Sequence, residues 1–175
     1  MASWPLSKRR KFNKKLILSG YKPGPVIDFQ VDKISCITDY LFLSAQVVST
    51  NYSLLQENNI THIVNCTHPS ECFGNLFQDI CYMNVPVLDK PFQYIRDYFE
   101  TTFQFIDEAI SQKGKVLVHC HMGISRSVTI VVAYLMKKYR LSLKDALLKV
   151  TQIRPIASPS IYFHQQLLQF EKTLK

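Results

Sequence analysis

The stretch VLVHCHMGISRSVTIVVAYLM, residues 116–136, decides the fold. Its first part, together with Lys115, reads KVLVH and lacks polar alternation, which is typical of a strand buried on both faces. The run Val128–Met136 is apolar all round and too long for a strand, and the basic run KKYR that follows it suits a helix C-terminus. We therefore predict a buried strand over 115–119, a loop, and a buried helix that begins near Arg126.

Strands and helices also alternate in the rest of the chain. Hydrophobic patterning predicts strands over 39–44, 61–66 and 80–87, and helices over 49–59, 97–111 and 142–154, with a last helix that Ser160 caps. Ser142 with Asp145 three positions later forms a capping-box-like start. This alternation predicts an α/β fold with a central mixed, largely parallel sheet flanked by helices.

The positive charge of the chain is concentrated at one end. The net charge is +8, and residues 1–25 hold seven of the 21 basic residues and no acid, so the remainder is nearly neutral. We predict a basic, flexible arm over 1–25 and one folded domain over 26–175. The segment SKRRKFNKK is compatible with a nuclear address, a nucleic-acid contact, an anionic membrane contact or a plain solvated tail.

The cysteines and the hydropathy bear on the compartment. Five cysteines without a Cys-x-x-Cys pair, and no apolar run long enough to span a bilayer, predict free thiols in the cytoplasm, the nucleus or both. His119, Cys120 and His121 would alternate in direction along a strand, which disfavours a shared metal ion. We therefore expect no metal and no cofactor, and the oligomeric state stays open.

The loop between the predicted strand and helix carries the chemistry. Ligands of open α/β sheets bind at the carboxyl edge of the strands, where backbone N–H groups and a helix N-terminus suit an oxyanion. Gly123 permits a tight turn, and Arg126 offers a planar fork for two phosphate oxygens. These surroundings favour the thiolate of Cys120, to which Ser127 can donate a hydrogen bond.

These residues resemble the signature of the cysteine-dependent protein phosphatases, and the tail SRS…AYLM is similar to the dual-specificity branch. The signature reads His119-Cys120-His121-Met122-Gly123-Ile124-Ser125-Arg126-Ser127, and the resemblance covers about residues 26–173. It implies that Cys120 is the nucleophile, that the backbone of residues 121–125 and Arg126 bind phosphate, and that His119 tunes the cysteine. A core histidine that donates to the backbone is a compatible reading of His119. The pair His121-Met122 is unusual, and Ser160 stands where the family commonly has Asn.

The family also places an aspartate on an upstream loop to protonate the leaving oxygen. Asp89 in VPVLDKP resembles that acid, although a turn or N-cap role is the alternative. Asp97 suits a helix N-cap, and Asp107 with Glu108 lies inside a helix facing water, so these acids are weaker candidates.

Two further residues matter through the resemblance. An arginine at the position of Arg154 can meet a second negative group on the substrate in related enzymes, and a helix-terminal arginine that neutralises its own dipole is an equal alternative. Asn65 resembles a residue that braces the active-site loops from outside them.

The resemblance implies a small, atypical phosphatase acting on phosphotyrosine and on phosphoserine or phosphothreonine. The short chain predicts a shallow pocket that admits both, and the partners expected are phosphorylated proteins, kinases among them. Alternatives are a non-protein substrate (a phosphoinositide, an RNA 5′-triphosphate or a phosphoglycan) and a phosphate-binding pseudo-enzyme. A redox role of the thiolate could coexist, with no indication from the sequence of which other cysteine lies near it.

Overall fold

A five-stranded sheet forms the centre of the protein. The computed structural model describes residues 31–70 and 74–174. The strands are β1 (Ser35–Thr38), β2 (Leu41–Ala45), β3 (His62–Asn65), β4 (Cys81–Asn84) and β5 (Val116–Cys120), in the spatial order β1-β2-β5-β3-β4. Only β1 runs antiparallel to its neighbour, and β2, β5, β3 and β4 are mutually parallel. The predicted mixed, largely parallel sheet is confirmed.

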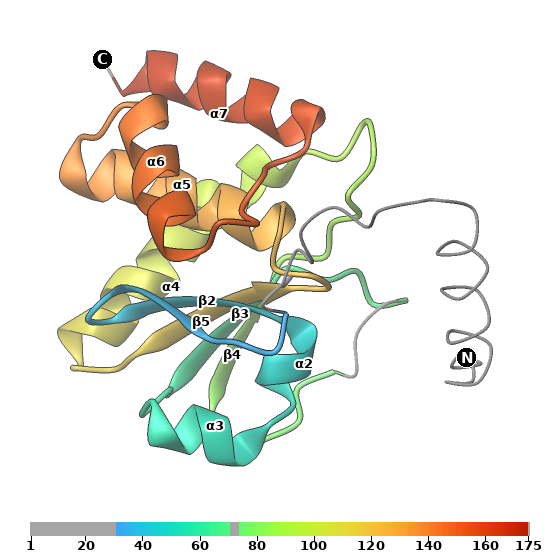
Figure 1. Ribbon diagram of the computed structural model, residues 1–175, viewed down its shortest axis with the longest axis vertical. Coiled ribbons are helices and arrows are strands. Elements are labelled where there is room, and N and C mark those ends of the chain that lie inside the picture. Colours follow the sequence, from blue (N-terminus) through green and yellow to red (C-terminus); the bar gives the residue numbers. More distant parts are fainter. Residues whose placement is uncertain (1–30, 71–73, 175) are drawn as a thin grey trace, which may run out of the picture.

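Helices cover both faces of this sheet (Figure 1). They are α2 (Gln46–Ser49), α3 (Tyr52–Glu57), the 3₁₀ helix η1 (Ile95–Tyr98), α4 (Phe99–Ser111), α5 (Arg126–Tyr139), α6 (Leu143–Ile153) and α7 (Ile161–Thr173). Helices α4 to α7 lie on one side of the sheet, and α2 and α3 lie on the other. The larger hydrophobic cluster fills the space under α4 to α7, and a smaller one around Phe42, Leu55 and Ile63 fills the space under α3.

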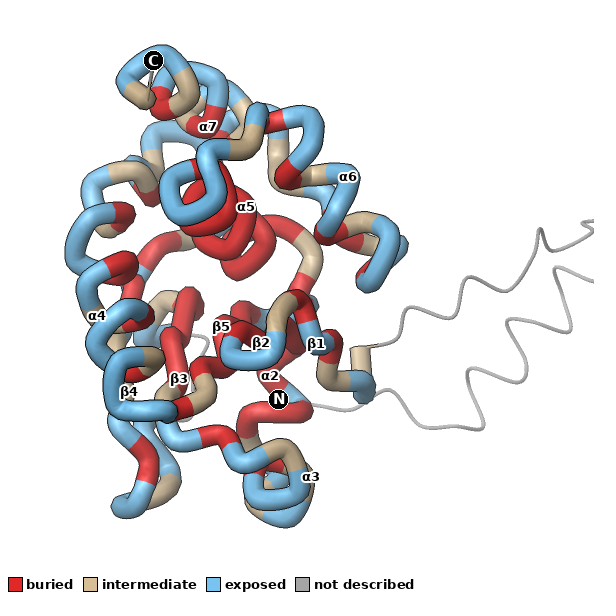
Figure 2. The backbone as a smooth tube through the Cα atoms, turned by 90° about the vertical axis from the view of Figure 1, so that its left-hand side faces the viewer, coloured by how far each residue is buried: buried red, intermediate tan, exposed pale blue. Residues whose placement is uncertain are grey.

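Helix α5 is the buried helix that the opening stretch predicts. Every residue from Arg126 to Met136 is buried, because α5 lies between the sheet and the helices α4, α6 and α7 (Figure 2). This position explains why the run is apolar all round and tolerates β-branched residues, since tertiary packing outweighs their weak helix propensity. The helix ends at Arg140, whose left-handed φ of 53° stops it after the basic run.

Some predicted elements differ from those observed. Strand β1 and helix α2 were not predicted, and the helix expected over 49–59 is the shorter α3, which Asn51 caps through a 3.2 Å bond from Leu54 N. Strand β4 ends at Asn84 and not at residue 87, because Pro86 has no N–H to continue the ladder.

The two predicted helix caps have different outcomes. The Ser142 cap is confirmed, since its Oγ accepts a hydrogen bond of 3.1 Å from Asp145 N. Ser160 does lie at the N-cap position of α7, but within the described residues its hydroxyl makes no cap bond, so that prediction is wrong. Its backbone N–H instead donates to Ser125 Oγ over 2.9 Å.

The predicted arm, residues 1–25, lies outside the described residues, and the boundary at residue 26 stays a prediction. Across residues 31–70 and 74–174, no helix combines the length and the apolar character that crossing a membrane requires.

Candidate active site

The site lies at the carboxyl end of β5, the middle strand of the sheet. Cys120 is the last residue of β5 and pairs with Ala45 of β2, while His119 pairs with Asn65 of β3. The next five residues form the loop to α5, called here the phosphate loop (residues 121–125). Because a strand borders β5 on each side, the start of this loop is fixed on both flanks.

The carbonyl groups of the phosphate loop all bond outward, to different parts of the fold. Their donors are Gln46 N for His121 O (3.3 Å), Arg154 Nη2 for Met122 O (3.3 Å), Arg154 Nε for Gly123 O (2.8 Å), Ser158 N for Ile124 O (2.8 Å) and Thr129 N for Ser125 O (2.8 Å). In a trans peptide the C=O points opposite to the N–H of the following residue, and the structure has no cis peptide bond. The amides of residues 122–126 therefore face away from these donors, toward the interior of the loop.

Gly123 is the residue that allows this loop to close. It has a left-handed φ of 65°, and a Cβ built there would lie 2.5 Å from Ser44 O and 2.7 Å from Arg154 Nη2. No larger residue fits this position without moving backbone atoms, which explains the glycine physically.

Cys120 is 2 % exposed, and Ser127 donates a hydrogen bond to its sulfur over 3.2 Å. Arg126 opens α5 next to it and is likewise buried, with Nη1 donating to Val87 O over 3.0 Å. The expected grouping of a sulfur, a hydroxyl donor and a guanidinium is thus present at one helix N-terminus.

Cys66 lies beside Cys120 on the neighbouring strand end. Its N–H donates to His119 O over 2.8 Å. Burial raises the pKa of the Cys66 thiol, the charge of a Cys120 thiolate raises it further, and Arg126 acts in the opposite direction. Cys66 is therefore a protonated thiol, and among the described cysteines it is the one that the strand register brings beside Cys120.

His119 is buried directly before Cys120. Burial lowers the pKa of its imidazole to about 4; the backbone of Cys120 opposes the shift, and the charge of Arg126 adds to it. His119 is consequently neutral near pH 7. Both interpretations made from the sequence, a core histidine and a neighbour of the cysteine, are compatible with this placement.

Arg154 holds the phosphate loop from outside. It is fully buried, and its guanidinium also donates to Ser35 Oγ (3.3 Å) and Lys33 O (3.4 Å) in addition to the two loop carbonyls. Burial lowers the pKa of Arg154, and the thiolate of Cys120 opposes this. The expectation that Arg154 meets a second negative group of the substrate is corrected, because its guanidinium is enclosed and bonded to the backbone. The alternative, an arginine facing its own helix dipole, does not describe these contacts either.

Asp89 lies on the loop that follows β4, called here the acid loop (residues 85–94). Its side chain is exposed. The hydrogen bond from Arg126 to Val87 O brings the backbone two residues before Asp89 to the guanidinium beside the phosphate loop. This contact joins two segments 39 residues apart and places Asp89 at the same edge of the sheet as Cys120.

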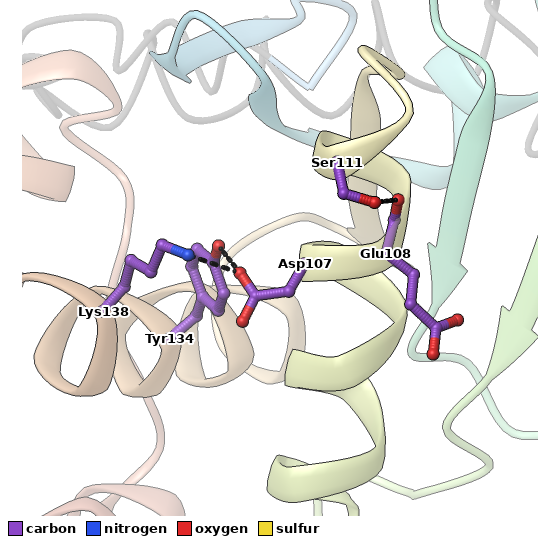
Figure 3. A network of polar contacts seen from close by, with 5 residues as sticks. All are labelled: Asp107, Glu108, Ser111, Tyr134 and Lys138. Carbon is purple, nitrogen blue, oxygen red and sulfur yellow. Dashed lines mark hydrogen bonds and ion pairs between the residues drawn. The ribbon is translucent and has the colours of Figure 1, made fainter.

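The competing acids lie elsewhere. Asp107 accepts hydrogen bonds from Tyr134 Oη (2.7 Å) and Lys138 Nζ (2.8 Å), and Glu108 lies on the same helix (Figure 3). Partial burial alone would raise the pKa of Asp107, but the bonds from Lys138 and Tyr134 leave it lowered. Asp107 and Glu108 are both exposed, as expected, and Asp107 in addition joins α4 to α5. Asp97 lies inside η1 and does not cap it.

Asn65 forms hydrogen bonds with the two chain segments that follow β3 and β4. Its buried side chain accepts hydrogen bonds from the N–H (3.0 Å) and the hydroxyl of Thr67, and its carbonyl accepts from Val85 N (2.8 Å). It therefore orders the turn after β3 and the start of the acid loop, consistent with the bracing role expected of it.

Several residues of the site were not identified from the sequence. Gln46 contacts His121 twice, through its N–H and through Oε1 (3.3 Å from His121 Nδ1), and Ser158 holds Ile124. These contacts are made by backbone or amide groups from elements distant in sequence, for which a single sequence carries no signal. Met122, by contrast, is 42 % exposed and lies at the rim of the loop.

In the part of the chain that the structure describes, no group of three or more His, Cys, Asp or Glu residues could hold a metal ion. The donors of the phosphate loop are amides and a guanidinium, which suit an anion.

Comparisons with known proteins agree with this geometry. The family model described as "Dual specificity phosphatase, catalytic domain" matches residues 41–173. The chain is 42 % identical to "Dual specificity protein phosphatase 1" of Arabidopsis thaliana over 147 residues, which cover 81 % of this chain and 70 % of the relative. It is 38 % identical to "Dual specificity protein phosphatase 18" of Mus musculus over 141 residues, covering 81 % and 74 %.

Solved structures extend the agreement to three dimensions. The structure titled "Crystal structure of DUSP15" superposes with a TM-score of 0.75 at 36 % identity, covering 79 % of this chain and 86 % of that one. Residues 119–127, which form the site, lie within the stretch that the family model matches. The chain belongs to the dual specificity phosphatase family.

Proposed function

We propose that this cysteine-dependent dual specificity protein phosphatase uses Cys120 as nucleophile, Arg126 and the phosphate-loop amides as the phosphate site, and Asp89 as general acid and base. The enzyme class follows from the family. The assignment of roles to individual residues is the proposal, and it is supported by the contacts described above.

The reaction has two steps. The Cys120 thiolate attacks phosphorus, a sulfur–phosphorus bond forms, the ester bond breaks, and the proton of Asp89 goes to the departing oxygen. In the second step Asp89 takes a proton from water, the water oxygen attacks phosphorus, and the sulfur–phosphorus bond breaks to release inorganic phosphate. Ser127 stabilises the thiolate as it leaves, through the hydrogen bond already present.

The observation that carries the proposal is the outward bonding of the five loop carbonyls. This bonding supports a ring of amides that faces the interior of the loop, and Arg126 adds a fixed positive charge. Preorganised donors of this kind stabilise charge that develops in a transition state.

The proposed substrates are phosphorylated proteins bearing phosphotyrosine and phosphoserine or phosphothreonine, kinases among them. Between Cys120 and Arg126 the loop contains neither Lys nor Arg. This composition favours a protein substrate over a polyanionic lipid or RNA. The presence of Cys120, Arg126 and Asp89 together favours an enzyme over a phosphate-binding pseudo-enzyme.

For the remainder of the chain we propose the assignment made from the sequence. Residues 26–175 form the catalytic domain, and residues 1–25 are a basic arm that contacts nucleic acid or an anionic membrane, or directs the protein to the nucleus. The proposed location is the cytoplasm, the nucleus or both.

The test compares the intact protein with Cys120→Ser, Asp89→Ala and the control Cys36→Ser, an exposed cysteine of β1. Turnover of phosphotyrosine and phosphothreonine peptides should vanish in Cys120→Ser, fall about a hundredfold or more in Asp89→Ala, and persist in the control. Rapid quenching into denaturant followed by mass spectrometry should detect a phosphoenzyme that is absent from Cys120→Ser. Unchanged turnover in Cys120→Ser would refute the proposal.

A further inference from the structure

The position of Asp89 depends on how its loop is held. The Asp89 side chain is exposed, so its place relative to Cys120 is set by the backbone of the acid loop. That loop leaves the sheet after Asn84 and joins η1 at Ile95. General acid catalysis is sensitive to position, since a displacement of about 1 Å can cost on the order of a hundredfold in rate.

The acid loop is closed on itself around Asp89. Leu88 N donates to the side-chain Oε1 of Gln93 over 3.2 Å. Phe92, with a left-handed φ of 61°, reverses the chain so that Gln93 can reach back to Leu88. Asp89 therefore lies inside a segment of six residues, 88–93, whose two ends are joined.

A single amide on α7 anchors the far end of this segment. Gln166 Nε2 donates to Gln93 O over 2.8 Å, and Gln166 Oε1 accepts from Arg96 N over 3.1 Å. Donor and acceptor of one side chain thus serve two backbone groups three residues apart. The near end is held at Val87 by Arg126.

The anchor itself is rigid. On α7 the side chains of Phe163, Leu167 and Phe170 are buried in the core, and they flank Gln166 in sequence. Gln166 is half-buried at the wall of a hollow of about 500 Å³ between the acid loop and α7, which Gln169 also lines. The bonds to Gln93 O and from Arg96 N link this helix to the backbone on either side of Tyr94 and Ile95, and a third bond of 3.4 Å from Gln166 Nε2 to Tyr162 O ties the amide to its own helix.

We propose that Gln166 is a positioning residue for the general acid: it holds the acid loop, through Gln93 and Arg96, where Asp89 reaches the leaving oxygen. This inference rests on the proposed role of Asp89 and goes beyond it, because Gln166 touches neither the substrate nor the reacting atoms. The requirement is for an amide, since glutamate would keep the acceptor for Arg96 N and lose the donor for Gln93 O.

The test uses leaving groups of different basicity. Dinitrophenyl phosphate releases an anion that needs no proton, whereas a phosphotyrosine peptide and phenyl phosphate release oxygens that do. Gln166→Ala should lower kcat by about tenfold to a hundredfold on the latter two and by less than about twofold on dinitrophenyl phosphate. The decline of the rate at high pH, which reports the protonated acid, should flatten in the same variant.

Three comparisons complete the design. Gln169→Ala, an exposed residue on the same helix and in the same hollow, should match the intact protein on all substrates. Gln166→Glu should show the same selective loss as Gln166→Ala, and it keeps the side-chain size if the alanine variant folds poorly. In an Asp89→Ala background, Gln166→Ala should cause no additional loss of kcat.

The outcomes separate the two hypotheses. If the intact protein hydrolyses none of the three esters, the proposed function fails. The positioning role of Gln166 is overturned, and the proposed function stands, if the intact protein hydrolyses the esters and one of three results is found. The first is that both Gln166 variants lose kcat equally on all three esters, and the second is that they lose kcat on none. The third is that the losses of kcat add in the Asp89→Ala background.

Discussion

At the scale of single residues, the buried groups around Cys120 are bonded to backbone more than to one another. Arg154 shows the consequence, because its one guanidinium satisfies the carbonyls of Met122 and Gly123 and also contacts the segment before β1. A residue that satisfies several buried acceptors is costly to remove, since each acceptor left without a partner is penalised.

Arg154→Ala should therefore destabilise the protein by about 2–4 kcal/mol and lower kcat/KM at least about tenfold. Arg154→Lys should recover little of either, because an ammonium group cannot reproduce the fork that spans two carbonyls. Urea unfolding and steady-state kinetics measure the two effects. A doubly phosphorylated peptide should lose no more than a singly phosphorylated one, and a selective loss on the former would restore the substrate-contact hypothesis.

His119 gives a pH dependence of stability. Its pKa is about 4 in the fold against 6.5 for a free histidine, so the unfolded chain binds a proton that the native state refuses between these values. The contribution of His119 to the free energy of unfolding is fully present above the pKa of the unfolded chain, and it is lost as the pH falls toward the pKa in the fold. Between pH ~7.5 and ~5 the loss should be about 2 kcal/mol.

Urea denaturation at the two pH values measures this loss, with His119→Gln as the comparison. The variant should show a smaller drop, by most of that amount, because the acid-sensitive group is gone. Equal drops in both proteins would mean that His119 takes up its proton without cost.

At the scale of elements, the phosphate loop is a turn whose outside is fully engaged. Gly123 is where the loop comes closest to its neighbours, since a Cβ would collide with the carbonyl of Ser44 in β2. Gly74 offers a matched position, with a φ of 77° and, within the described residues, no atom within 4 Å of the place that a Cβ would take.

Both Gly123→Ala and Gly74→Ala place alanine at a positive φ, which costs roughly 1–2 kcal/mol. Only Gly123→Ala should also displace the loop, so its kcat/KM on phosphotyrosine peptides should fall more than about tenfold while Gly74→Ala stays within about twofold. Thermal unfolding of both variants gives the shared backbone cost. Equal activities in the two variants would show that the loop accommodates the methyl group.

The elements also show what sequence patterns can and cannot predict. The run after Arg126 predicts α5 correctly because burial on all sides leaves a continuous apolar pattern, and Ser142 with Asp145 predicts the start of α6 because capping is local. The closure of the acid loop by Gln93 and Gln166 leaves no such pattern. Glutamine is a residue type typical of solvent-facing helix positions. Only the packing of α7 against η1 brings the Gln166 side chain to the acid loop.

The placement of Arg154 failed for a related reason. A charged residue at a helix end is expected to face water or an anion. The position of Arg154 in the sequence does not predict which backbone carbonyls surround it in the fold. The signature residues Cys120, Arg126 and Ser127 were found because their spacing along one strand, one turn and one helix sets their geometry directly.

At the scale of the whole molecule, the contacts described for the site come from residues 33–166, and residues 1–30 lie outside the described structure. Deleting residues 1–20 should leave kcat/KM on a small aryl phosphate within about twofold of the full chain, because the groups proposed for catalysis all lie within residues 89–127. Steady-state kinetics on p-nitrophenyl phosphate measures this. A large loss would show that the basic segment belongs to the catalytic domain.

The place of β5 between β2 and β3 has a consequence for motion. Edge strands open most readily, and here the edges are β1 and β4, one strand removed from Cys120 on either side. Amide hydrogen exchange should therefore be fast at Cys81–Asn84 and slowest at Val116–Cys120. Fraying of either border would leave β5 paired with β2 and β3, so the strand that carries the sulfur keeps its place while the margins of the sheet open.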